Sequence, residues 1–471
     1  MKCFKGGPMD DFLGKFAWFK KFSAVQQIAL SFVFVILTGA LLLSLPISNR
    51  ISGTGFIDHL FTSTSAVCVT GLATVIPMVQ YTVFGQFIII LLMQIGGLGL
   101  MTLIAVFLIF VGGKLSHTEK LAMAEAVNRP TLGSLGHFLK FILLYTLIFE
   151  GSGFLLLLIR FVPEFGVTQG AYNALFLAVS AFCNAGLDNF AMDNLVRYVS
   201  DPLVSLTVAS LIIMGGLGFG VWFDLSQGAR SILKGKKTFK FAVKHLRPHT
   251  KLAISMTGIL LLSGTILIFL VEYTNPNSLN TYPFGTKLLA SFFQSTTLRT
   301  AGFSTVNIGN LRAFTQFFMM IFMFIGGSPG GTAGGIKTTT FAILVLMVVA
   351  EIRGRNEIVV FNRSIPRDTF RKSFIIFFAL LGTLFTGILL LSLIEPYSFL
   401  AISFEATSAI GTVGLSMGIT QVLTEAGKMI IITLMYLGRI GPLTLILSLG
   451  KPTKNKKIND VNYPSADILI G

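Results

Sequence analysis

A nine-residue motif occurs four times in this chain, each time after a long apolar segment. The copies read TSAVCVTGL (64–72), VSAFCNAGL (179–187), STTLRTAGF (295–303) and TSAIGTVGL (407–415). Their shared glycines, Gly71, Gly186, Gly302 and Gly414, are 115, 116 and 112 residues apart. A period this regular predicts one structural unit used four times. Four copies in one chain favour four walls around one axis, which is the geometry of a pore.

The composition indicates an integral membrane protein. The chain is 53% hydrophobic and only 12% charged, a balance that soluble domains do not show. Residues 23–49 and 82–113 contain no charged side chain over 27 and 32 residues. Each stretch is long enough to cross about 30 Å of hydrocarbon as a helix. Because the first is too long for the core of a signal peptide, we expect it to be a retained spanning helix.

The basic residues indicate how the chain is oriented. Of the 36 Lys and Arg, 26 lie in five polar stretches that hold only 9 of the 20 acidic residues: 1–22, 112–136, 226–251, 350–372 and 450–471. Loops enriched in Lys and Arg stay in the cytoplasm. We therefore expect both termini and the three loops between units to be cytoplasmic. On this interpretation the net charge of +16 sets topology, and no nucleic-acid partner is expected.

If every loop between units is cytoplasmic, each unit must leave and re-enter the same side, and two spanning helices per unit satisfy this. We expect first helices at 24–45, 137–161, 250–271 and 371–394, and second helices at 84–111, 203–223, 314–349 and 429–449. About eleven residues of helical composition precede each motif glycine, at 58–68, 172–183, 287–298 and 399–410. At 1.5 Å per residue these reach about half-way through a bilayer. They predict re-entrant half-helices, each followed by an extended return.

The expected fold is therefore an all-α integral membrane fold of four tandem units in a pseudo-fourfold arrangement around one pore. It has eight spanning helices and four re-entrant half-helices. The expected units are 24–112, 137–225, 250–349 and 371–449, flanked by cytoplasmic segments 1–23 and 450–471.

A second glycine cluster follows each motif by about 24 to 29 residues: QIGGLG (94–99), MGGLGFG (214–220), IGGSPGGTAGGIK (325–337) and LGRIGP (437–442). For the first two, ordinary small-residue helix packing is as good an explanation as an irregular backbone. The third holds six glycines and a proline within ten residues and cannot be a continuous helix. Irregular backbone at membrane depth is tolerated only where it is buried or lines a watery cavity. We expect this third cluster to be a flexible loop across the pore, and so a gate.

The motif suits the passage of a monovalent cation. A dehydrated cation needs oxygen ligands, and backbone carbonyls supply them without a full charge. Aiming successive carbonyls at one axis requires unusual dihedral angles, which glycine adopts without steric cost. The half-helices direct their partly negative C-terminal ends toward the same point. The motifs carry neither a ring of Lys or Arg nor an acidic ring, which argues against anion and divalent selectivity.

The motifs resemble a known family. TLRTAGFSTV (297–306) and SAIGTVGLS (408–416), with IGGSPGGTAGGIKTTT (325–340) and LGRIGPLT (437–444), are similar to the Trk/Ktr/HKT superfamily of potassium transporters. The resemblance spans about 24–449. Because the first unit begins near the N-terminus, the chain looks like the membrane subunits of bacterial Ktr systems, of KtrB or KtrD type, rather than TrkH. The resemblance implies potassium uptake across the bacterial cell membrane.

It also implies residue roles. The four motif glycines would form a selectivity filter, with carbonyls from Val69, Thr70, Asn184, Ala185, Thr300, Ala301, Thr412 and Val413. The glycine-rich loop would be an intramembrane gate made of Gly326, Gly327, Ser328, Pro329, Gly330, Gly331, Thr332, Ala333, Gly334 and Gly335, with Lys337 at its cytoplasmic edge and Arg439 in the pore wall beneath it. Each unit keeps one glycine where potassium channels have T-V-G-Y-G, which leaves the strictness of selection against sodium open.

The resemblance further implies partners and ions. These are a homodimer, stimulation by sodium, and a cytoplasmic RCK-type regulatory ring of KtrA or KtrC type that binds ATP or ADP. Potassium is the expected substrate, and no organic cofactor is expected in this chain because its glycine-rich runs fall in apolar segments rather than between a strand and a helix. The basic loop 226–251 is expected either to contact anionic membrane lipids or to dock the regulatory ring.

Several alternatives stay open. A barrier in the pore is a better explanation of Arg439 than an arginine that reaches the membrane–water interface. For Lys337, structural anchoring and gating are equally favoured. Arg299 is expected to cap a half-helix, with Glu405 as a guessed partner, and Glu150 to be packed or paired. The alternative function is a secondary transporter of a small organic solute, which would show inverted repeats and charged midplane residues. An enzyme is not expected, because no acid, base, nucleophile and metal-ligand set converges.

Overall fold

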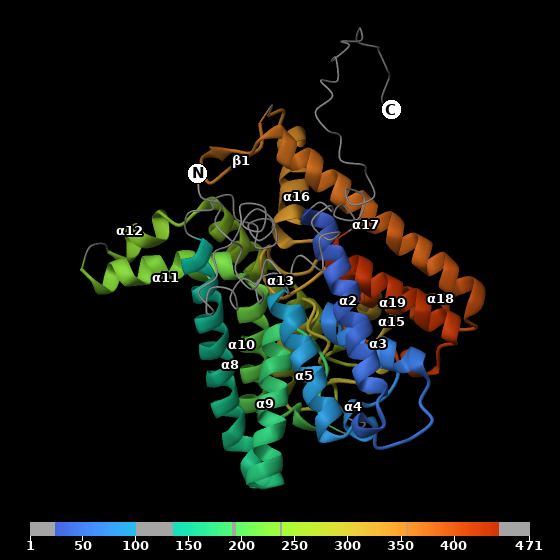
Figure 1. Cartoon of the computed structure of the whole chain (residues 1–471). Coiled ribbons are helices and arrows are strands. Elements are labelled where there is room, and N and C mark those ends of the chain that lie inside the picture. The colour runs from blue at the N-terminus through green and yellow to red at the C-terminus, as the bar shows by residue number, and fades with distance from the viewer. Residues whose placement is uncertain (1–23, 100–134, 191–194, 236–237, 356, 442–471) are drawn as a thin grey trace, which may run out of the picture.

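The computed structural model describes residues 24–99, 135–190, 195–235, 238–355 and 357–441. The expected cytoplasmic ends, the last part of the second helix of unit 1, the first loop between units and residues 442–449 lie outside this described part. Nearly all regular structure is helical (Figure 1). The sheet found in the described ranges is one short antiparallel hairpin of β1 (Val359–Val360) and β2 (Arg363–Ser364).

Four long helices open the four units: α2 (Ala24–Ser44), α8 (Leu135–Phe165), α13 (Pro248–Glu272) and α17 (Arg367–Ile394). Their positions agree with the predicted first helices. Among the described residues these four are long and apolar enough to cross a membrane, and a fifth crossing is added if α10 (Pro202–Gly216) and α11 (Phe219–Leu233) are one bent span. Their outward side chains are large and apolar, for example Leu147 and Leu270, each 67% exposed. Such an exposed apolar surface suits contact with lipid.

Four shorter helices end just before the motif glycines: α3 (Phe56–Cys68), α9 (Val167–Cys183), α14 (Phe284–Thr297) and α18 (Phe399–Gly411). These are the predicted half-helices, extended at their N-terminal ends in the first three units. Their C-terminal halves are buried on all sides, since residues 401–411 of α18 are all buried. Four helix ends therefore lie in the interior of the molecule.

The second helices are shorter or more broken than predicted. They are α5 (Val83–Leu98), α10 followed by α11, α15 (Ala313–Phe324) followed by α16 (Thr338–Ile352), and α19 (Glu425–Ile440). The continuous helix expected at 203–223 is wrong, because α10 and α11 meet at an angle of 97°. The helix expected at 314–349 is interrupted by residues 325–337, as its glycine cluster predicted. Eight unbroken crossings are consequently not seen in the described part of the chain.

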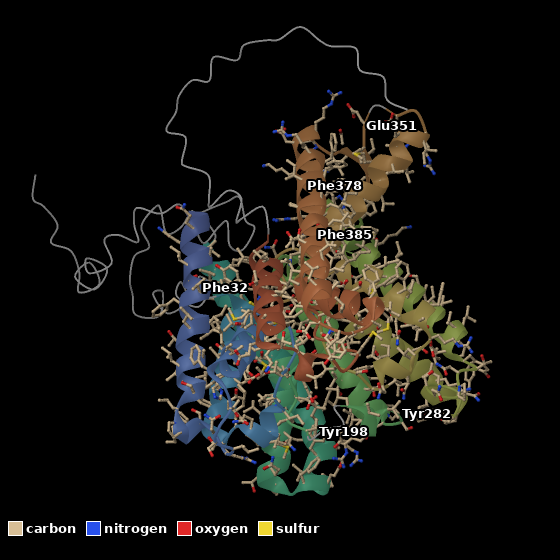
Figure 2. All side chains as sticks on the ribbon, turned by 90° about the vertical axis from the view of Figure 1, so that its right-hand side faces the viewer. Phe32, Tyr198, Tyr282, Glu351, Phe378 and Phe385 are labelled. Carbon is tan, nitrogen blue, oxygen red and sulfur yellow. The ribbon has the colours of Figure 1, made fainter. Side chains whose placement is uncertain are left out.

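Short elements complete the fold. Helical turns connect the longer elements: η2 (Pro46–Ser48), α4 (Pro77–Gln80), η3 (Val196–Tyr198), η4 (Ile308–Asn310) and η5 (Thr420–Val422). The helix α12 (Phe239–Lys244) lies between α11 and α13. In Figure 2, the labelled Tyr198 and Tyr282 lie at one end of the molecule and Glu351 at the other.

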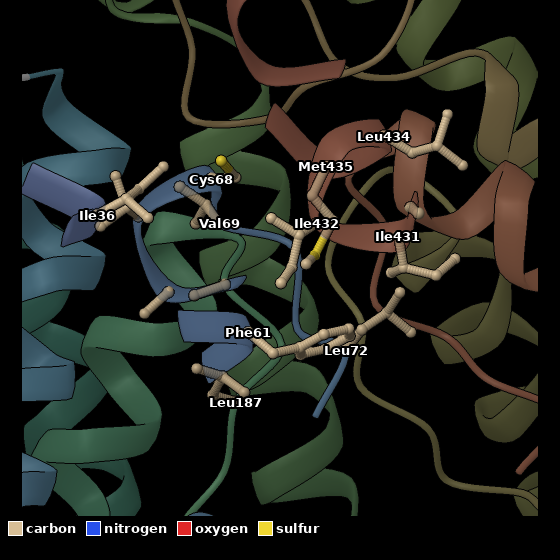
Figure 3. Packing of buried hydrophobic residues seen from close by; sticks show 14 of the residues in the cluster. Ile36, Phe61, Cys68, Val69, Leu72, Leu187, Ile431, Ile432, Leu434 and Met435 are labelled. Atoms are coloured by element: carbon tan, nitrogen blue, oxygen red, sulfur yellow. The ribbon is translucent and has the colours of Figure 1, made fainter. Parts of the chain in front are cut away.

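The units pack in a closed order. α5 of unit 1 contacts α9 of unit 2, α10 contacts α14 of unit 3, and α15 contacts α18 of unit 4. The order closes because α19 of unit 4 contacts α3 of unit 1. Figure 3 shows this last contact, where Phe61 and Cys68 of α3 lie in the same apolar cluster as Ile432 and Met435 of α19. Each half-helix is thus held by the second helix of the preceding unit, which places the four helix ends around a common centre.

Candidate functional site

The backbone makes the same unusual turn after all four half-helices. The residue two positions before each motif glycine has a positive φ: 56° at Val69, 58° at Asn184, 64° at Thr300 and 50° at Thr412. The motif glycines follow with φ between 68° and 101°. A positive φ is a true outlier for β-branched Val and Thr, and such strain is kept where the surroundings enforce it, often at functional sites.

Hydrogen bonds from the helix end hold this turn. Thr70 N donates to Ser65 O, Ala185 N to Ser180 O and Val413 N to Ser408 O, each at 2.8 Å. In units 1 and 4 the serine hydroxyl also accepts from the motif glycine, at 3.0 Å from Gly71 N and 3.1 Å from Gly414 N. These bonds satisfy groups that a helix C-terminus and its following turn would leave unpaired.

The hydroxyls of units 2 and 3 depart from this pattern. Ser180 donates to Leu187 O at 2.5 Å, and Thr296, at the same position in unit 3, donates to Phe292 O within its own helix at 2.9 Å. Sequence reasoning missed this group of residues, although the signal was present as a Ser or Thr six positions before every motif glycine.

The motif glycines lie against one another in a ring. A β-carbon at Gly71 would lie 2.9 Å from Gly186 Cα, and one at Gly186 would lie 2.8 Å from Gly302 Cα. A β-carbon at Gly302 would lie 3.2 Å from Gly414 Cα, and one at Gly414 would lie 2.9 Å from Gly71 Cα. The order is that of the helix packing, and it closes. We call these four residues the glycine ring; a side chain on any of them would overlap the backbone of the next unit.

The carbonyls predicted as ligands lie at the same place. The backbone oxygens of Thr70, Ala185, Ala301 and Val413 are each among the nearest atoms to the glycine of the preceding unit. Of the described threonines, three near the ring have buried hydroxyls without a hydrogen-bond partner: Thr70, Thr300 and Thr412. The structure therefore brings together all twelve residues predicted for the filter, from segments that are more than 100 residues apart.

Two acidic residues near this region accept hydrogen bonds from neighbouring groups. The pairing of Arg299 with Glu405 is wrong, because no ion pair joins these two buried side chains. The Glu405 carboxylate instead accepts hydrogen bonds from Ser416, Met417 N and Thr420, which fixes the chain after Gly414. Glu150 accepts from Gln94 Nε2 at 2.6 and 2.7 Å and is buried, so it is paired as predicted.

A second set of glycines ends three of the second helices. Gly99, Gly218 and Gly441 have φ of 80°, 91° and 86° with ψ of 130°, 140° and 134°. Only glycine adopts this region readily. Three residues before each lies another glycine that packs on the carbonyl of a half-helix: Gly96 on Val67, Gly215 on Phe182 and Gly438 on Ile410. These clusters therefore combine the two explanations that the sequence left open, helix packing and a break.

In unit 3 the break is the glycine-rich loop, and it is firmly held. Ser328 N donates to Gly216 O at 2.9 Å, Thr332 N to Gly215 O at 3.2 Å, and Phe219 N to Gly330 O at 3.0 Å. At its ends, Gly326 N donates to Ile336 O at 2.8 Å and Thr338 N to Gly327 O at 2.9 Å. These bonds join the loop to the break between α10 and α11, and its flexibility stays a prediction.

The same loop runs beneath the half-helix ends. Thr332 Oγ1 donates to Phe182 O at 3.2 Å, and a β-carbon at Gly335 would lie 3.3 Å from Gly411 O. The loop thus extends from the end of α9 in unit 2 to the end of α18 in unit 4, on the side of the ring where the second helices break.

The two predicted cations of the gate have different attachments. Arg439 in the last turn of α19 donates from one nitrogen to Thr332 O and from the other to Gly96 O at 2.5 Å, so it joins unit 4 to the loop and to α5. Lys337 Nζ donates to Ala333 O at 2.6 Å, within the loop itself. Charge-assisted bonds of this kind are about twice as strong as neutral ones, and Arg439 links three units.

Comparison with known proteins finds a family and several relatives that match nearly the whole chain. The TrkH family, described as a cation transport protein, matches residues 4–460. Ktr system potassium uptake protein B of Bacillus subtilis is 41% identical over 451 residues, which cover 96% of this chain and 97% of that protein. Potassium/sodium uptake protein NtpJ of Enterococcus hirae is 38% identical over 458 residues, covering 96% and 98%.

A solved structure shares the fold. The potassium transporter TrkH from Vibrio parahaemolyticus aligns with a TM-score of 0.71 over 91% of this chain and 85% of that one, at 18% identity. The relatives are named as transport proteins rather than as enzymes. From the match over most of its length and the close relatives, this chain belongs to the TrkH family of cation transport proteins.

Proposed function

We propose that this chain conducts potassium into the cell through a pore on the axis of its four units, with the glycine ring as the selectivity filter. The observation that carries the proposal is the closure of the ring, in which each motif glycine contacts the next and the fourth contacts the first. A pore lined by four equivalent backbones needs this arrangement. The names of the relatives, potassium uptake and potassium/sodium uptake proteins, support potassium as the cargo.

The chemistry of the ring supports a monovalent cation. Its ligands would be the carbonyls of residues 69–70, 184–185, 300–301 and 412–413, together with the unpaired hydroxyls of Thr70, Thr300 and Thr412. Oxygen dipoles replace a hydration shell without binding the ion too tightly to leave. Four half-helix C-termini point their partly negative ends at the same centre, which favours cations over anions.

We further propose that residues 326–335 close the pathway beneath the ring and that Arg439 holds them closed. The bonds from Arg439 to Thr332 and Gly96 would have to break for the loop to move. Because the bonds of Lys337 stay inside the loop, its role would be to keep the loop folded. We also propose that the four tandem units are arranged in the membrane with both termini of the chain in the cytoplasm.

The wider assembly is proposed by analogy with the relatives. The name Ktr system uptake protein B supports a further subunit, for which we propose a cytoplasmic nucleotide-binding ring. A homodimer and stimulation by sodium are proposed on the same ground, the latter supported by the name of the Enterococcus hirae relative.

Ion uptake in a bacterium that lacks its own potassium uptake tests the proposal. The wild type should restore growth at low potassium, while Gly302→Ser should lose this and admit sodium, because its side chain would overlap Val413 O and Gly186 Cα. Gly258→Ser is the matched control, since Gly258 lies on α13 of the same unit with open space around it. Equal uptake by all three proteins would refute a filter at Gly302. No uptake by any of them calls for co-expression of a regulatory subunit, and failure to transport even then would refute potassium as the cargo.

A further inference from the structure

The hairpin of α11 and α12 projects from the helix bundle. α10 is an apolar helix of the bundle, and α11 leaves it at 97°. Figure 1 shows α11 and α12 extending sideways, away from the other helices, at the end of the molecule where β1 lies. If α10 runs along the membrane normal, α11 lies in the plane of the membrane surface.

Contacts with α8 and with the residue before α13 hold the first half of α11 in place. The first half of α11 is fixed to α8, where Phe223 packs edge-on against Phe138 and Phe141 with ring centroids 5.4 and 5.0 Å apart. Asp224 accepts from Arg247 N at 3.0 Å, which ties the start of α11 to the residue before α13. The projecting half is therefore presented at a fixed angle.

The projecting half is strongly basic. Residues 226–251 contain eight Lys and Arg and no Asp or Glu. On the described part of the hairpin Arg230, Lys234, Lys240 and Lys244 are exposed. The carboxylate that faces it, Asp224, is already paired with Arg247. Within the described ranges, no ion pair neutralises these four basic side chains.

Apolar side chains lie between these charges. Leu233 is 86% exposed, Phe239 73%, and Phe241 and Val243 44% each. A soluble surface seldom presents such residues together. Basic residues interleaved with Leu and Phe on a helix that lies parallel to the membrane are the signature of an interfacial segment.

We propose that the α11–α12 hairpin lies on the membrane surface and binds the headgroups of anionic phospholipids, with Leu233 and Phe239 inserted between them. That this is the cytoplasmic surface of the membrane rests on the proposed orientation of the chain, whereas the binding of anionic headgroups does not. The charge would be met by lipid phosphates, and the apolar side chains would leave water. A docked protein would satisfy the charge as well, but the in-plane angle and the apolar residues at the tip favour lipid.

Fluorescence of the full-length protein in nanodiscs tests this without measuring transport. Phe239→Cys in a Cys3→Ser background is labelled with the environment-sensitive dye NBD. The discs contain either phosphatidylcholine alone or about a third phosphatidylglycerol, with a doxyl-lipid quencher. We expect quenching to be roughly twofold stronger in the anionic discs and to weaken with salt.

Variants that remove positive charges distinguish binding by the hairpin from a general attraction of the protein to anionic lipid. Lys234→Gln, Lys240→Gln and Lys244→Gln together should abolish the difference between the two discs. The matched control removes three exposed charges after the end of α16 and in the first turns of α17: Arg353→Gln, Arg355→Gln and Lys372→Gln. It should leave the difference unchanged. Equal quenching in both discs would overturn binding of anionic headgroups. A dye that stays in water in both discs would overturn the membrane placement and favour a protein partner.

Discussion

The four units are alike around the glycine ring and differ from one another beneath it. Around the glycine ring, the four turns share a positive φ two residues before the glycine and a second one at the glycine itself. Beneath the ring, the second helices diverge: one bends by 97°, one gives way to the glycine-rich loop, and one carries Arg439. If the ring selects and the loop gates, this difference has a simple reason. An ion on an axis needs equivalent ligands from every side, whereas one obstructing element is enough to stop it.

The comparison predicts which substitutions alter selection and which alter rate. Changes in the ring should change which ion passes, whichever unit carries them. Changes beneath the ring should alter the rate alone, and their size should depend on the unit.

The largest effect is expected from Gly186→Ala. A methyl group there would lie 2.7 Å from Ala301 O, at a φ of 68°, and the left-handed conformation alone costs an alanine about 1–2 kcal/mol. We expect potassium uptake to fall by about tenfold or more, with loss of preference over sodium. Gly151→Ala, in an open position on α8 of the same unit, is the control. Retained selectivity in a well-expressed Gly186→Ala protein would contradict an equivalent role for unit 2.

The next effect is expected from Arg439→Ala, in the opposite direction. Removing the guanidinium frees Thr332 O and Gly96 O and releases the loop from units 1 and 4. Potassium flux into proteoliposomes should rise several-fold, which corresponds to an activation barrier lower by about 1 kcal/mol. Selectivity should be unchanged. Lys337→Met should do less, since its bond stays inside the loop. A lower flux, or a changed ion preference, would show that Arg439 belongs to the structure of the pathway rather than to its gate.

A smaller effect separates unit 3 from units 1 and 4. Ser65→Ala and Ser408→Ala each remove the hydroxyl that accepts from a ring glycine. An unpaired buried N–H costs about 1–3 kcal/mol, so we expect a lower melting temperature and weaker discrimination in competitive uptake of potassium and sodium. Thr296→Val should leave discrimination intact, because that hydroxyl bonds within its own helix. Identical behaviour of the three variants would show that the hydroxyl of unit 3 has the same role as those of units 1 and 4.

The smallest effect is expected where the ring of units closes. Lys428 of α19 and Asp58 of α3 form an ion pair of 2.6 Å between units 4 and 1, with side chains 14% and 17% exposed. Lys428→Met or Asp58→Asn should leave potassium uptake and selectivity unchanged, and should lower the free energy of unfolding by about 1–3 kcal/mol because the remaining partner is left unpaired and mostly buried. In a double-mutant cycle the two changes should be less than additive. Full additivity would mean that the pair contributes nothing to closure.

The region around the glycine ring was predicted from the sequence better than the region beneath it. The period of the motif located all four half-helices, because a β-branched or small residue next to a glycine at the end of a helical segment is a local signal. The bend after Gly216 was missed, since MGGLGFG has the same composition whether its glycines pack or break a helix. Whether the helix continues or breaks there depends on contacts with Phe182 O and with the loop of unit 3, which are distant in sequence.

Side-chain pairing could not be predicted in the same way. Arg299 and Glu405 are the charges nearest to two motifs, and pairing them was reasonable from charge alone. Glu405 instead holds Thr420 and Met417 N of its own unit, because a carboxylate facing the start of a loop finds several donors within a few residues. A Ser or Thr six residues before each glycine repeats as regularly as the glycines, but only the structure shows which of these hydroxyls accept from a ring glycine.

The most direct test of a filter at the glycine ring is to locate a bound ion. We would soak crystals of the protein with rubidium, a substitute for potassium, and measure anomalous scattering. We expect a peak on the axis of the ring, among the carbonyls of Thr70, Ala185, Ala301 and Val413, which weakens when potassium is added in excess. An empty ring with a peak elsewhere in the protein would contradict a filter at this ring.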